Sequence, residues 1–548
     1  MVHKNILNIK DHYDVCIAGA GAAGISLAYE LSKQNKTVLL IESGEFSFDD
    51  FFDSLKSIDS CRLKIKDNSR ERIVGGNTTT WGGLVSTLDR IDFENREWVS
   101  DSLWPISYEE LFKFYKKIDK KYNFPDLSFL ENNKIEDLDQ KTSDLKIRNF
   151  KSKLFLSLRP EPNFQKIFKK ELEINIDILV GHSLEEVYLN DELLKVNKFK
   201  IFDKDAKHFF IDCSDAYVLT LNAVENARVL LNSNKQIKQG IGNQYDNVGR
   251  YFMNHPKGHF GMIKPRNKNQ DFSKYWGFML GEYSGFNAFV LEDKIQIKEK
   301  LLNSYIRFEP FYSWTDNEGV SIFVNMSKRL KVFYYYFINI NKNKVVSLRD
   351  FSETDEDLSP HKKSTFFQLI RNTLIVVKNT KYIVEYIYFR ISNKTPRLKG
   401  IRLRNIMEMR PSFTNVVKLS EGRNVFGYQK AIVDYDFSEL DKRTIIKIHE
   451  ILDKSLRKMD FGEVVSNISD YINNWPINYD SSHHLGTTRM GNDKNLSVVD
   501  KNLKVHGLEN LYIAGGSVFP TSGNANPVYT IVALSIRLAE HLNREKNE

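Results

Sequence analysis

Two histidines stand side by side in the stretch SSHHLGTTRMG at residues 481–491, directly before a Leu-Gly-Thr tripeptide. Imidazole accepts a proton near neutral pH without much help from its surroundings, so this pair is a candidate for general base catalysis. A chain of 548 residues also carries histidines that are simply buried or solvated. Whether His483 or His484 takes part in chemistry therefore depends on what the rest of the chain supplies.

A nucleotide-binding pattern occupies residues 13–44, YDVCIAGAGAAGISLAYELSKQNKTVLLIESG. An apolar strand, the GxGxxG motif, a helix-spaced segment and a second apolar strand follow one another, which favours a nucleotide site over the alternative of a glycine-rich turn without a ligand. Gly19 permits the tight turn, Gly21 lets the backbone approach a pyrophosphate, and Gly24 allows helix and strand to pack closely. The helix N-terminus offers free N–H groups to phosphates. Glu42 lies 18 residues after Gly24 (42 − 24), where it can bind a ribose.

Two further glycine-rich segments extend this candidate site. The segment RIVGGNTTTWGG at 72–83 holds four glycines around a threonine run and suits backbone that lies against a flat ring system. The segment LYIAGGSVFPTSGNANPVYT at 511–530 gives an apolar strand end, a Gly-Gly turn and an Asn-Pro dipeptide. We therefore expect pieces from both ends of the chain to build one site.

Blocks that touch roughly half of the chain resemble the glucose–methanol–choline (GMC) oxidoreductases, which are FAD-dependent. WPISYEEL at 104–111 is similar to the branch that contains pyranose oxidases and the large subunits of gluconate and fructose dehydrogenases. The resemblance implies an α/β fold with a Rossmann-like FAD-binding domain and a substrate domain of antiparallel sheet and helices. The matching blocks are GAGAAG at 19–24, VGGNTTTWGG at 74–83, VENARVLLNS at 224–233, NVGRYFMNHP at 247–256, SHHLGTTRMG at 482–491 and NLYIAGGSVFPTSGNANP at 510–527.

The motifs and the resemblance together assign a set of cofactor-binding residues. They are Gly19, Gly21, Ala22, Ala23, Gly24, Glu42, Ser43, Gly75, Gly76, Thr80, Trp81, Gly82, Gly83, Gly515, Gly516, Asn526 and Pro527. Thr80 stands where pyranose oxidases carry the histidine that is bonded to the flavin, so we expect noncovalent FAD. The family often has an Asp before SVFP; Ala514 and two glycines take its place here, and a carboxylate contact to the ribityl chain is missing or replaced.

The family motif H-x-x-G-T makes His483 the matching histidine, counted back from the Gly-Thr pair at 486–487. Family precedent pairs this residue with a His or Asn before a proline, and Asn526 lies 43 residues on (526 − 483). The resemblance implies that His483 takes the alcohol proton while a hydride passes to flavin N5, and that Asn526 holds the substrate oxygen. The alternatives are His484 as the base, two structural histidines, and Asn526 as a turn residue. His255 matches a family block that usually packs structurally, and we leave it out of catalysis.

The length of 548 residues predicts at least two domains. We expect an FAD-binding domain from 1–100, 205–260 and 495–548, and a substrate-binding domain from 101–204 and 261–494. The three cysteines are far apart and form no CxxC pair, so we expect no metal site. No window approaches the roughly 18 apolar residues of a membrane span, and the N-terminus lacks the features of a signal peptide. A cytoplasmic location is the resulting prediction.

A basic, aromatic-rich insertion is expected at about 328–404. Residues 361–404 contain eleven Lys or Arg against one acid, Glu385, which gives +10 where the whole chain carries +8. Such a segment could lay an apolar face on the inner surface of an anionic membrane, as a peripheral attachment. The alternative is an ordinary core under a solvated, charged face. No recognition fold accompanies the charge, so no nucleic-acid partner is expected.

The leading functional hypothesis is FAD-dependent oxidation of a CH–OH group to a carbonyl in a sugar or sugar-like alcohol. The partner would be a small-molecule alcohol or saccharide, and the electron acceptor stays open. One alternative is a non-sugar alcohol such as choline or an aliphatic alcohol. A quaternary ammonium would call for an aromatic cage with a carboxylate in 260–410, where the aromatics are accompanied mainly by Lys and Arg. The other alternative is a flavin-binding partner protein without turnover, which intact His483 and Asn526 disfavour.

Overall fold

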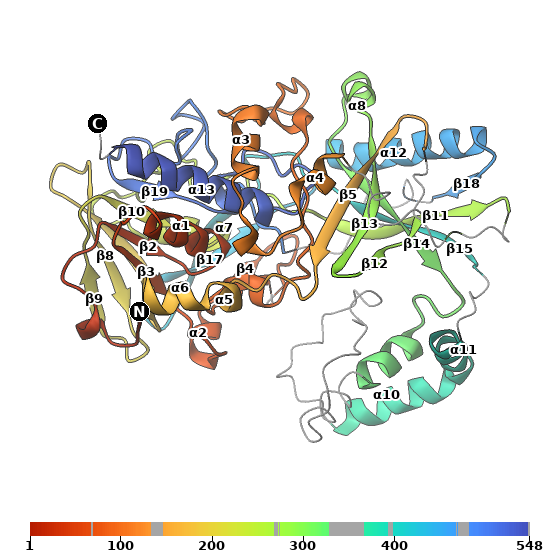
Figure 1. Cartoon of the computed structure of the whole chain (residues 1–548), viewed down its shortest axis with the longest axis horizontal. Coiled ribbons are helices and arrows are strands. Elements are labelled where there is room, and N and C mark those ends of the chain that lie inside the picture. Colours follow the sequence, from red (N-terminus) through yellow and green to blue (C-terminus); the bar gives the residue numbers. More distant parts are fainter. Residues whose placement is uncertain are drawn as a thin grey trace.

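The computed structural model describes most of the chain. The residues outside the description are 67–68, 133–145, 268–271, 273–274, 328–365, 393–397, 467, 469–481 and 546–548. Figure 1 shows a body of parallel strands and helices beside a body built on a larger antiparallel sheet. A pair of helices, α10 (Phe366–Lys378) and α11 (Thr380–Ile391), is set apart below the antiparallel sheet in this view.

The first body is built on a six-stranded sheet in the order β1-β6-β3-β2-β10-β19, in which every neighbouring pair is parallel. Its strands are β1 (Val2–His3), β2 (Val15–Ala18), β3 (Val38–Glu42), β6 (Asp177–Val180), β10 (Ala216–Leu219) and β19 (Leu511–Ile513). Nearly all of their residues are buried, as expected for short apolar strands covered on both faces. Strand β10 lies between β2 and β19, so the two ends of the chain meet in one sheet, and the predicted Rossmann-like fold is confirmed.

Helices cover this sheet. Helix α1 (Ala22–Ser32) packs against α13 (Val528–Glu545), and α13 also contacts α3 (Tyr108–Tyr115). Helix α7 (Ala223–Asn232) packs against two small sheets. It contacts strand β7 (Ser183–Leu189) in one of them and strand β16 (Val416–Arg423) in the other. The remaining short helices are η1 (Ile6–Asn8), α2 (Asp50–Ser54), η3 (Gly76–Thr79), η4 (Arg90–Phe93), η5 (Lys120–Tyr122), α4 (Leu127–Asn132), α5 (Phe164–Ile167), α6 (Lys169–Ile174), α8 (Asp293–Glu299) and η10 (Gly516–Val518).

Two segments depart from the domain boundaries expected from the sequence. The segment 101–204 was assigned to the substrate domain, but β6 within it pairs with β1 and β3 in the parallel sheet. The segment 261–494 contains β17 (Gln429–Asp434), which pairs in parallel with β4 (Asp59–Ser60) of the first body. Strand β6 is a four-residue DILV run without a ligand motif, so only its long-range pairing reveals where it belongs.

The second body is built on a seven-stranded antiparallel sheet in the order β12-β13-β14-β15-β11-β18, with β5 paired to β13. Its strands are β5 (Phe150–Leu158), β11 (Lys257–Pro265), β12 (Phe278–Leu280), β13 (Tyr283–Leu291), β14 (Tyr305–Phe311), β15 (Gly400–Ile406) and β18 (Gly462–Val465). One face packs on α12 (Glu439–Lys458), whose buried Ile445, Ile448 and Leu452 recur at helical spacing. The predicted antiparallel sheet with helices is confirmed. A separate three-stranded sheet joins β7, β8 (Val196–Phe202) and β9 (His208–Ile211).

The insertion expected at 328–404 falls into three parts. Residues 328–365 and 393–397 lie outside the described residues, and 366–391 carry α10 and α11. Residues 400–404 are not part of an insertion, because they belong to β15, where Arg402 and Arg404 pair with Glu309. Some of the counted positive charge therefore belongs to the antiparallel sheet. Among the described residues, no helix combines the length and apolarity needed to cross a bilayer.

Candidate functional site

The N-terminus of α1 has the geometry that a dinucleotide requires. A Cβ on Gly24 would lie 1.9 Å from the carbonyl oxygen of Gly19, so helix and turn approach more closely than any side chain permits. A Cβ on Gly21 would meet nothing within 4 Å, so the backbone there borders open space. Gly21 is also the N-cap of α1, and the first-turn N–H groups of a helix face outward at that point. A pyrophosphate fits this arrangement.

The other two glycine-rich segments reach the same place. The Gly75 N–H donates to the carbonyl of Ala20 over 2.8 Å, and a Cβ on Gly76 would lie 3.1 Å from Cα of Gly21. A Cβ on Gly515 would lie 3.8 Å from the Cβ of Ala23 in the first turn of α1. The structure thus brings together three segments that are far apart in the sequence.

Some residues expected at the cofactor have structural contacts of their own. The Trp81 indole N–H donates to the carbonyl of Pro162 over 2.6 Å. A Cβ on Gly83 would lie 2.4 Å from Oγ of Ser157 on β5, and its φ is +70°. Close packing therefore explains the glycine at 83. Thr80, directly before Trp81, and Gly82, directly after it, are exposed.

Glu42 links the glycine turn at Ala20 to the loop at Gly44 through hydrogen bonds. Its carboxylate accepts hydrogen bonds from the N–H of Ala20 and the N–H of Gly44, each over 2.8 Å, and from the Ser43 hydroxyl over 3.1 Å. Burial raises the pKa of Glu42, and the two backbone donors oppose that shift only in part. A carboxylate offers about four acceptor positions, so capacity for a ribose hydroxyl is left.

The segment that carries the paired histidines is held from both sides. Met253 and Leu485 exchange two backbone hydrogen bonds of 3.0 Å in antiparallel fashion, which sets His255 opposite His483. On the other side the segment runs along η10 of the C-terminal region. Its backbone N–H donors there are Gly486 to Gly516, Thr488 to Ser517 and Met490 to Val518, over 3.2, 2.9 and 2.8 Å.

The hydrogen bonds of His255 determine where the protons lie. Its Nε2 is 3.0 Å from the carbonyl oxygens of both Ser522 and Gly523, and since carbonyls only accept, Nε2 carries the proton. Burial lowers the pKa of His255 to about 4, so the ring is neutral at pH 7 and its Nδ1 is an acceptor. That Nδ1 lies 2.9 Å from Nδ1 of His483. The His483 Nδ1–H therefore donates to His255, and Nε2 is the basic atom of neutral His483.

The neighbouring His484 has a different environment. Its ring packs against Phe252, with centroids 5.6 Å apart. The backbone carbonyl oxygen of His484 lies 2.8 Å from the position that a Cβ on Gly516 would take, so the backbone at 484 packs directly against the Gly-Gly turn. Among the residues that the structure describes, His255 forms its histidine contact with His483.

Asn526 lies at the start of the last helix. Its Nδ2 donates to the carbonyl of Leu84 over 2.9 Å, which uses one of the two amide N–H groups. Pro527 follows, and its carbonyl accepts from the N–H of Ile531 in the first turn of α13. Proline at the start of a helix has the right φ and loses no hydrogen bond. The same loop, residues 522–526, thus holds Asn526 and the two carbonyls that fix His255.

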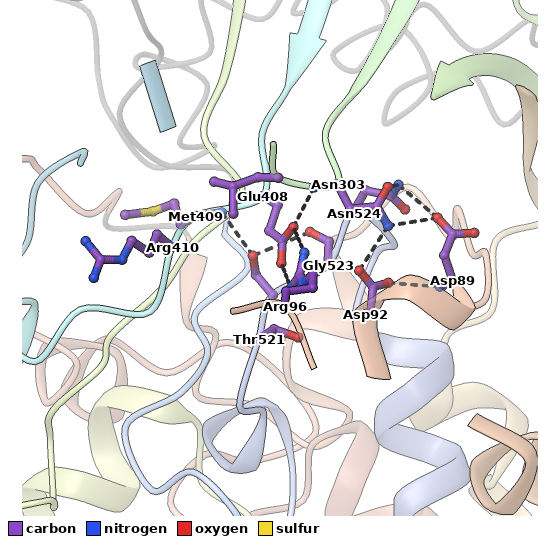
Figure 2. A network of polar contacts seen from close by, with 12 residues as sticks. Asp89, Asp92, Arg96, Asn303, Glu408, Met409, Arg410, Thr521, Gly523 and Asn524 are labelled. Carbon is purple, nitrogen blue, oxygen red and sulfur yellow. Dashed lines mark hydrogen bonds and ion pairs between the residues drawn. The ribbon is translucent and has the colours of Figure 1, made fainter. Parts of the chain in front are cut away.

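A buried polar network lies behind this loop, as Figure 2 shows. Arg96, 1% exposed, makes two hydrogen bonds of 2.8 and 2.7 Å to the carboxylate of Glu408. Asn303 donates to Asp89 and Asp92 over 2.9 Å each. Burial, followed by the nearby charges of Glu408 and Asp89, raises the pKa of Asp92 to about 7. Loss of one partner from such a cluster would leave a buried charge uncompensated.

This network anchors the loop from below. Thr521 accepts from the Trp104 indole over 2.9 Å, and the Ser522 hydroxyl accepts from the N–H of Met409, next to Glu408, over 3.1 Å. The Lys153 ammonium donates to the amide oxygen of Asn524 over 2.6 Å. Three anchors, at residues 521, 522 and 524, therefore hold the loop whose carbonyls orient His255.

A row of charged residues follows on the antiparallel sheet. The cross-strand pair Tyr305–Ile406 packs with Leu84, and the next pairs on that face are Arg307–Arg404 and Glu309–Arg402, about 7 Å apart along the strands. His259 and the arginines hold the pKa of Glu309 well below its usual range, although burial alone would raise it. The negative charge of Glu309 is therefore already compensated by its neighbours.

His255 was missed as a functional residue by the sequence argument. The MNHP block suggested packing, and packing is part of its role, since it is 1% exposed. Its contact with His483 depends on the antiparallel pairing of 253 with 485, across more than two hundred residues. The adjacent Asn254 also ties the two segments together, because its amide oxygen accepts hydrogen bonds from the backbone N–H groups of His255 and His483.

Parts of the chain are similar to known proteins. Residues 411–535 match the GMC oxidoreductase family model, and residues 17–47 match a NAD(P)-binding Rossmann-like domain. Paromamine 6'-oxidase of Streptomyces fradiae is 29% identical over 140 residues, which are 26% of this chain and 25% of that protein. The fructose dehydrogenase large subunit of Gluconobacter japonicus is 31% identical over 24% of this chain and 23% of its own length. The matched segments thus span about a quarter of these relatives.

A solved structure extends the likeness to the whole fold. An FAD-dependent oxidoreductase from Chaetomium thermophilum matches with a TM-score of 0.56 at 13% identity, over 98% of this chain and 100% of that one. At such low identity the match supports the architecture alone. The family model and the relatives show that segments of this chain are similar to GMC oxidoreductases, and the solved structure shows a similar fold.

Proposed function

We propose that this protein is an FAD-dependent oxidoreductase that converts a CH–OH group of a sugar or sugar-like alcohol to a carbonyl, with His483 as the base. The observation that carries the proposal is the hydrogen-bond chain from the Ser522 and Gly523 carbonyls through His255 to His483. It holds the proton of neutral His483 on Nδ1, so Nε2 is the atom that takes the substrate proton.

The residues around α1 suit FAD. The open space at Gly21 and the N-terminus of α1 would take the pyrophosphate, and Glu42 would take a ribose hydroxyl. The segments 74–83 and 515–516 would lie against the remainder of the cofactor. Bound FAD supplies an acceptor for the hydride of the alcohol carbon.

The protein residues then handle the alcohol proton and the position of the alcohol oxygen. His483 accepts the hydroxyl proton at Nε2, while its Nδ1–H keeps the bond to His255. Asn526, fixed to the carbonyl of Leu84, orients the oxygen and limits the motion of the substrate. His255 is a positioning residue, because it acts on the substrate only through His483.

Two observations favour a sugar over a cationic alcohol. The relatives include proteins named for paromamine and for fructose. On the sheet face next to Leu84, the carboxylate of Glu309 is already held by His259, Arg402 and Arg404. A quaternary ammonium would meet guanidinium groups there instead of an available carboxylate.

The proposal is tested by anaerobic titration of the purified protein with sugars, nucleotide sugars, choline and simple alcohols, followed by flavin absorbance. His483→Ala should retain bound FAD and lose about 10²–10⁴-fold in the rate of flavin reduction, the usual worth of a general base. His484→Ala is the matched control and should be much milder. The reverse order of the two variants would contradict the assignment of His483, and no reduction by any alcohol would contradict the activity.

The mode of FAD attachment has its own test. Thr80, at the position where pyranose oxidases carry the attached histidine, is exposed and ends η3, and a hydroxyl is not an expected attachment point. Acid precipitation should therefore release the flavin into the supernatant. Flavin that stays with the washed pellet would overturn the noncovalent assignment.

A further inference from the structure

Helix α11 and the preceding helical residues 318–327 share a small core, and Val376 of α10 packs against it. Val320 and Val324, in the helical residues 318–327, pack with Ile383 and Tyr386 of α11. This cluster is separate from the main cores of the two bodies. The chain leaves the antiparallel sheet after β14 and returns to it at the neighbouring strand β15, so the pair projects from the sheet, as Figure 1 shows.

The opposite faces of the two helices are apolar and exposed. On α10, Phe367, Ile370, Leu374 and Val377 recur at intervals of three and four residues and are 44–82% exposed. On α11, Val384, Tyr388 and Ile391 do the same and are 57–78% exposed. Single exposed apolar side chains are ordinary, but seven in two helical stripes form a patch of the kind that marks an interaction site.

Basic side chains accompany these stripes. Arg371 lies three residues before Leu374, and Lys378 lies four residues after it, so both share the exposed face of α10. Lys381 has the same relation to Val384 on α11. Residues 366–391 hold four Lys or Arg and one acid, a net charge of +3. The acid, Glu385, is turned toward the body, where it accepts a hydrogen bond from Ser313.

We propose that α10 and α11 lie flat on an anionic lipid surface and attach the protein peripherally to a membrane. The alternating apolar and basic residues on one face match lipid chains and anionic headgroups at the interface. Tyr388 has an apolar ring and a polar hydroxyl, which suits that depth. The helices, of 13 and 12 residues, are too short to span a bilayer.

Charge favours lipid over a second copy of the chain. In a symmetric pairing of two such faces, Arg371, Lys378 and Lys381 of one copy would approach the same residues of the other. Like charges brought together in this way oppose association. An anionic headgroup layer complements the same residues. The inference does not depend on the proposed oxidation, because it concerns only surface residues of the helical pair.

The test is co-sedimentation of the full-length protein with vesicles of phosphatidylcholine containing about 30 mol% phosphatidylglycerol, against vesicles of phosphatidylcholine alone. Binding should require the anionic lipid and weaken as salt rises from about 0.05 M to about 0.5 M. Protein that stays in the supernatant with anionic vesicles at low salt would overturn the proposal. Binding of equal strength to both vesicles would overturn it too.

Variants locate the contact on the helical pair. Leu374→Asp should lower the partition coefficient about ten-fold or more, since it removes buried apolar surface and adds repulsion. The matched control is Val425→Asp, a comparably exposed apolar residue on the turn between β16 and β17, which should bind like the wild type. Equal losses in both variants would overturn the assignment of this face.

A charge series separates the local patch from the overall charge. Replacing Arg371, Lys378 and Lys381 by Gln should cost roughly five-fold per residue. The control replaces three exposed lysines elsewhere, Lys169, Lys195 and Lys294, with the same change in net charge. Equal losses would show that the general charge of +8 is responsible and would overturn the proposal. So would a dimer that Leu374→Asp dissociates while vesicle binding persists.

Discussion

The surroundings of His483 and the helical pair α10–α11 differ in how tightly their side chains are fixed. Around His483, two carbonyls and a buried histidine set the proton positions, and three anchors hold the loop beneath. In and beside the helical pair, four buried residues from α11 and residues 318–327 form a small core, and the exposed stripes of α10 and α11 carry seven apolar side chains. Chemistry requires groups held in place, whereas a docking face requires only the right composition on one side.

The largest expected effect is the difference between substitutions at Gly24 and at Gly21, two glycines of the same turn. Gly24→Val should prevent folding of the nucleotide-binding body, because a Cβ would lie 1.9 Å from the Gly19 carbonyl oxygen. Gly21→Ala should fold normally and lose FAD, since its Cβ would meet no protein atom within 4 Å. The measurements are circular dichroism and the flavin content of the purified proteins. Full flavin content in Gly21→Ala would show that the pyrophosphate does not lie there.

The next effect tests the buried network. Arg96→Met should destabilise the protein by about 3–5 kcal/mol, because it leaves the Glu408 carboxylate buried without its bidentate partner. The double variant Arg96→Met/Glu408→Met should recover much of the loss. Arg457→Met, which removes an exposed pair with Asp453, is the control and should leave the denaturant transition unchanged. A single variant as stable as the wild type would mean that the loop does not depend on this pair.

The motifs made the glycine turn predictable, because each of Gly19, Gly21 and Gly24 has a local reason in the backbone. That both chain ends contribute to one sheet was also anticipated, since both carry strand and turn patterns, whereas the place of β10 between β2 and β19 was not. The position of β6 between β1 and β3 was not predicted, because a four-residue apolar run fits any sheet. Likewise, the pair Arg96–Glu408 joins positions 312 apart and leaves no local pattern.

The candidate site shows the same division. The H-x-x-G-T motif points to His483 as a candidate, whereas the contact of His483 with His255 depends on strand register between distant segments. Of the helical pair, composition predicted the basic and apolar character. It did not predict that Arg402 and Arg404 belong to β15, because charge counts carry no information on pairing.

The pKa of His255 predicts a pH-dependent contribution to stability. An unfolded histidine takes up a proton below about pH 6.5, whereas His255 in the fold stays neutral down to about pH 4. Protons therefore favour the unfolded chain between these values, and the contribution present above about pH 6.5 is lost as the pH falls to about 4. It amounts to roughly 3 kcal/mol. His255→Gln should lack this contribution. The measurement is the free energy of unfolding by denaturant at several pH values. The same dependence of that free energy on pH in the wild type and the variant would contradict the prediction.

The role of His255 in catalysis should appear as a change in kcat. His255→Leu removes the acceptor of the His483 Nδ1–H and should lower kcat about 10²-fold with little change in KM, because the base loses its fixed tautomer. His255→Gln should restore most of the activity, since an amide donates to the carbonyls and accepts from His483. A purely packing role would give no rescue by Gln. Steady-state kinetics across pH distinguish the two, because a base without its partner shifts the pH profile.

The smallest effect tests the helical pair itself. Leu374→Ser should change the free energy of unfolding by no more than about 0.5 kcal/mol, since Leu374 is already 65% exposed. Ile383→Ala, in the same pair, should cost about 2–4 kcal/mol, because Ile383 is buried in its four-residue core. This core is separate from the main ones, so the loss should appear as faster hydrogen exchange in 366–391 with unchanged exchange around His255 and His483. A stability loss in Leu374→Ser as large as that of Ile383→Ala would mean that the apolar face packs on the protein and is not a docking surface.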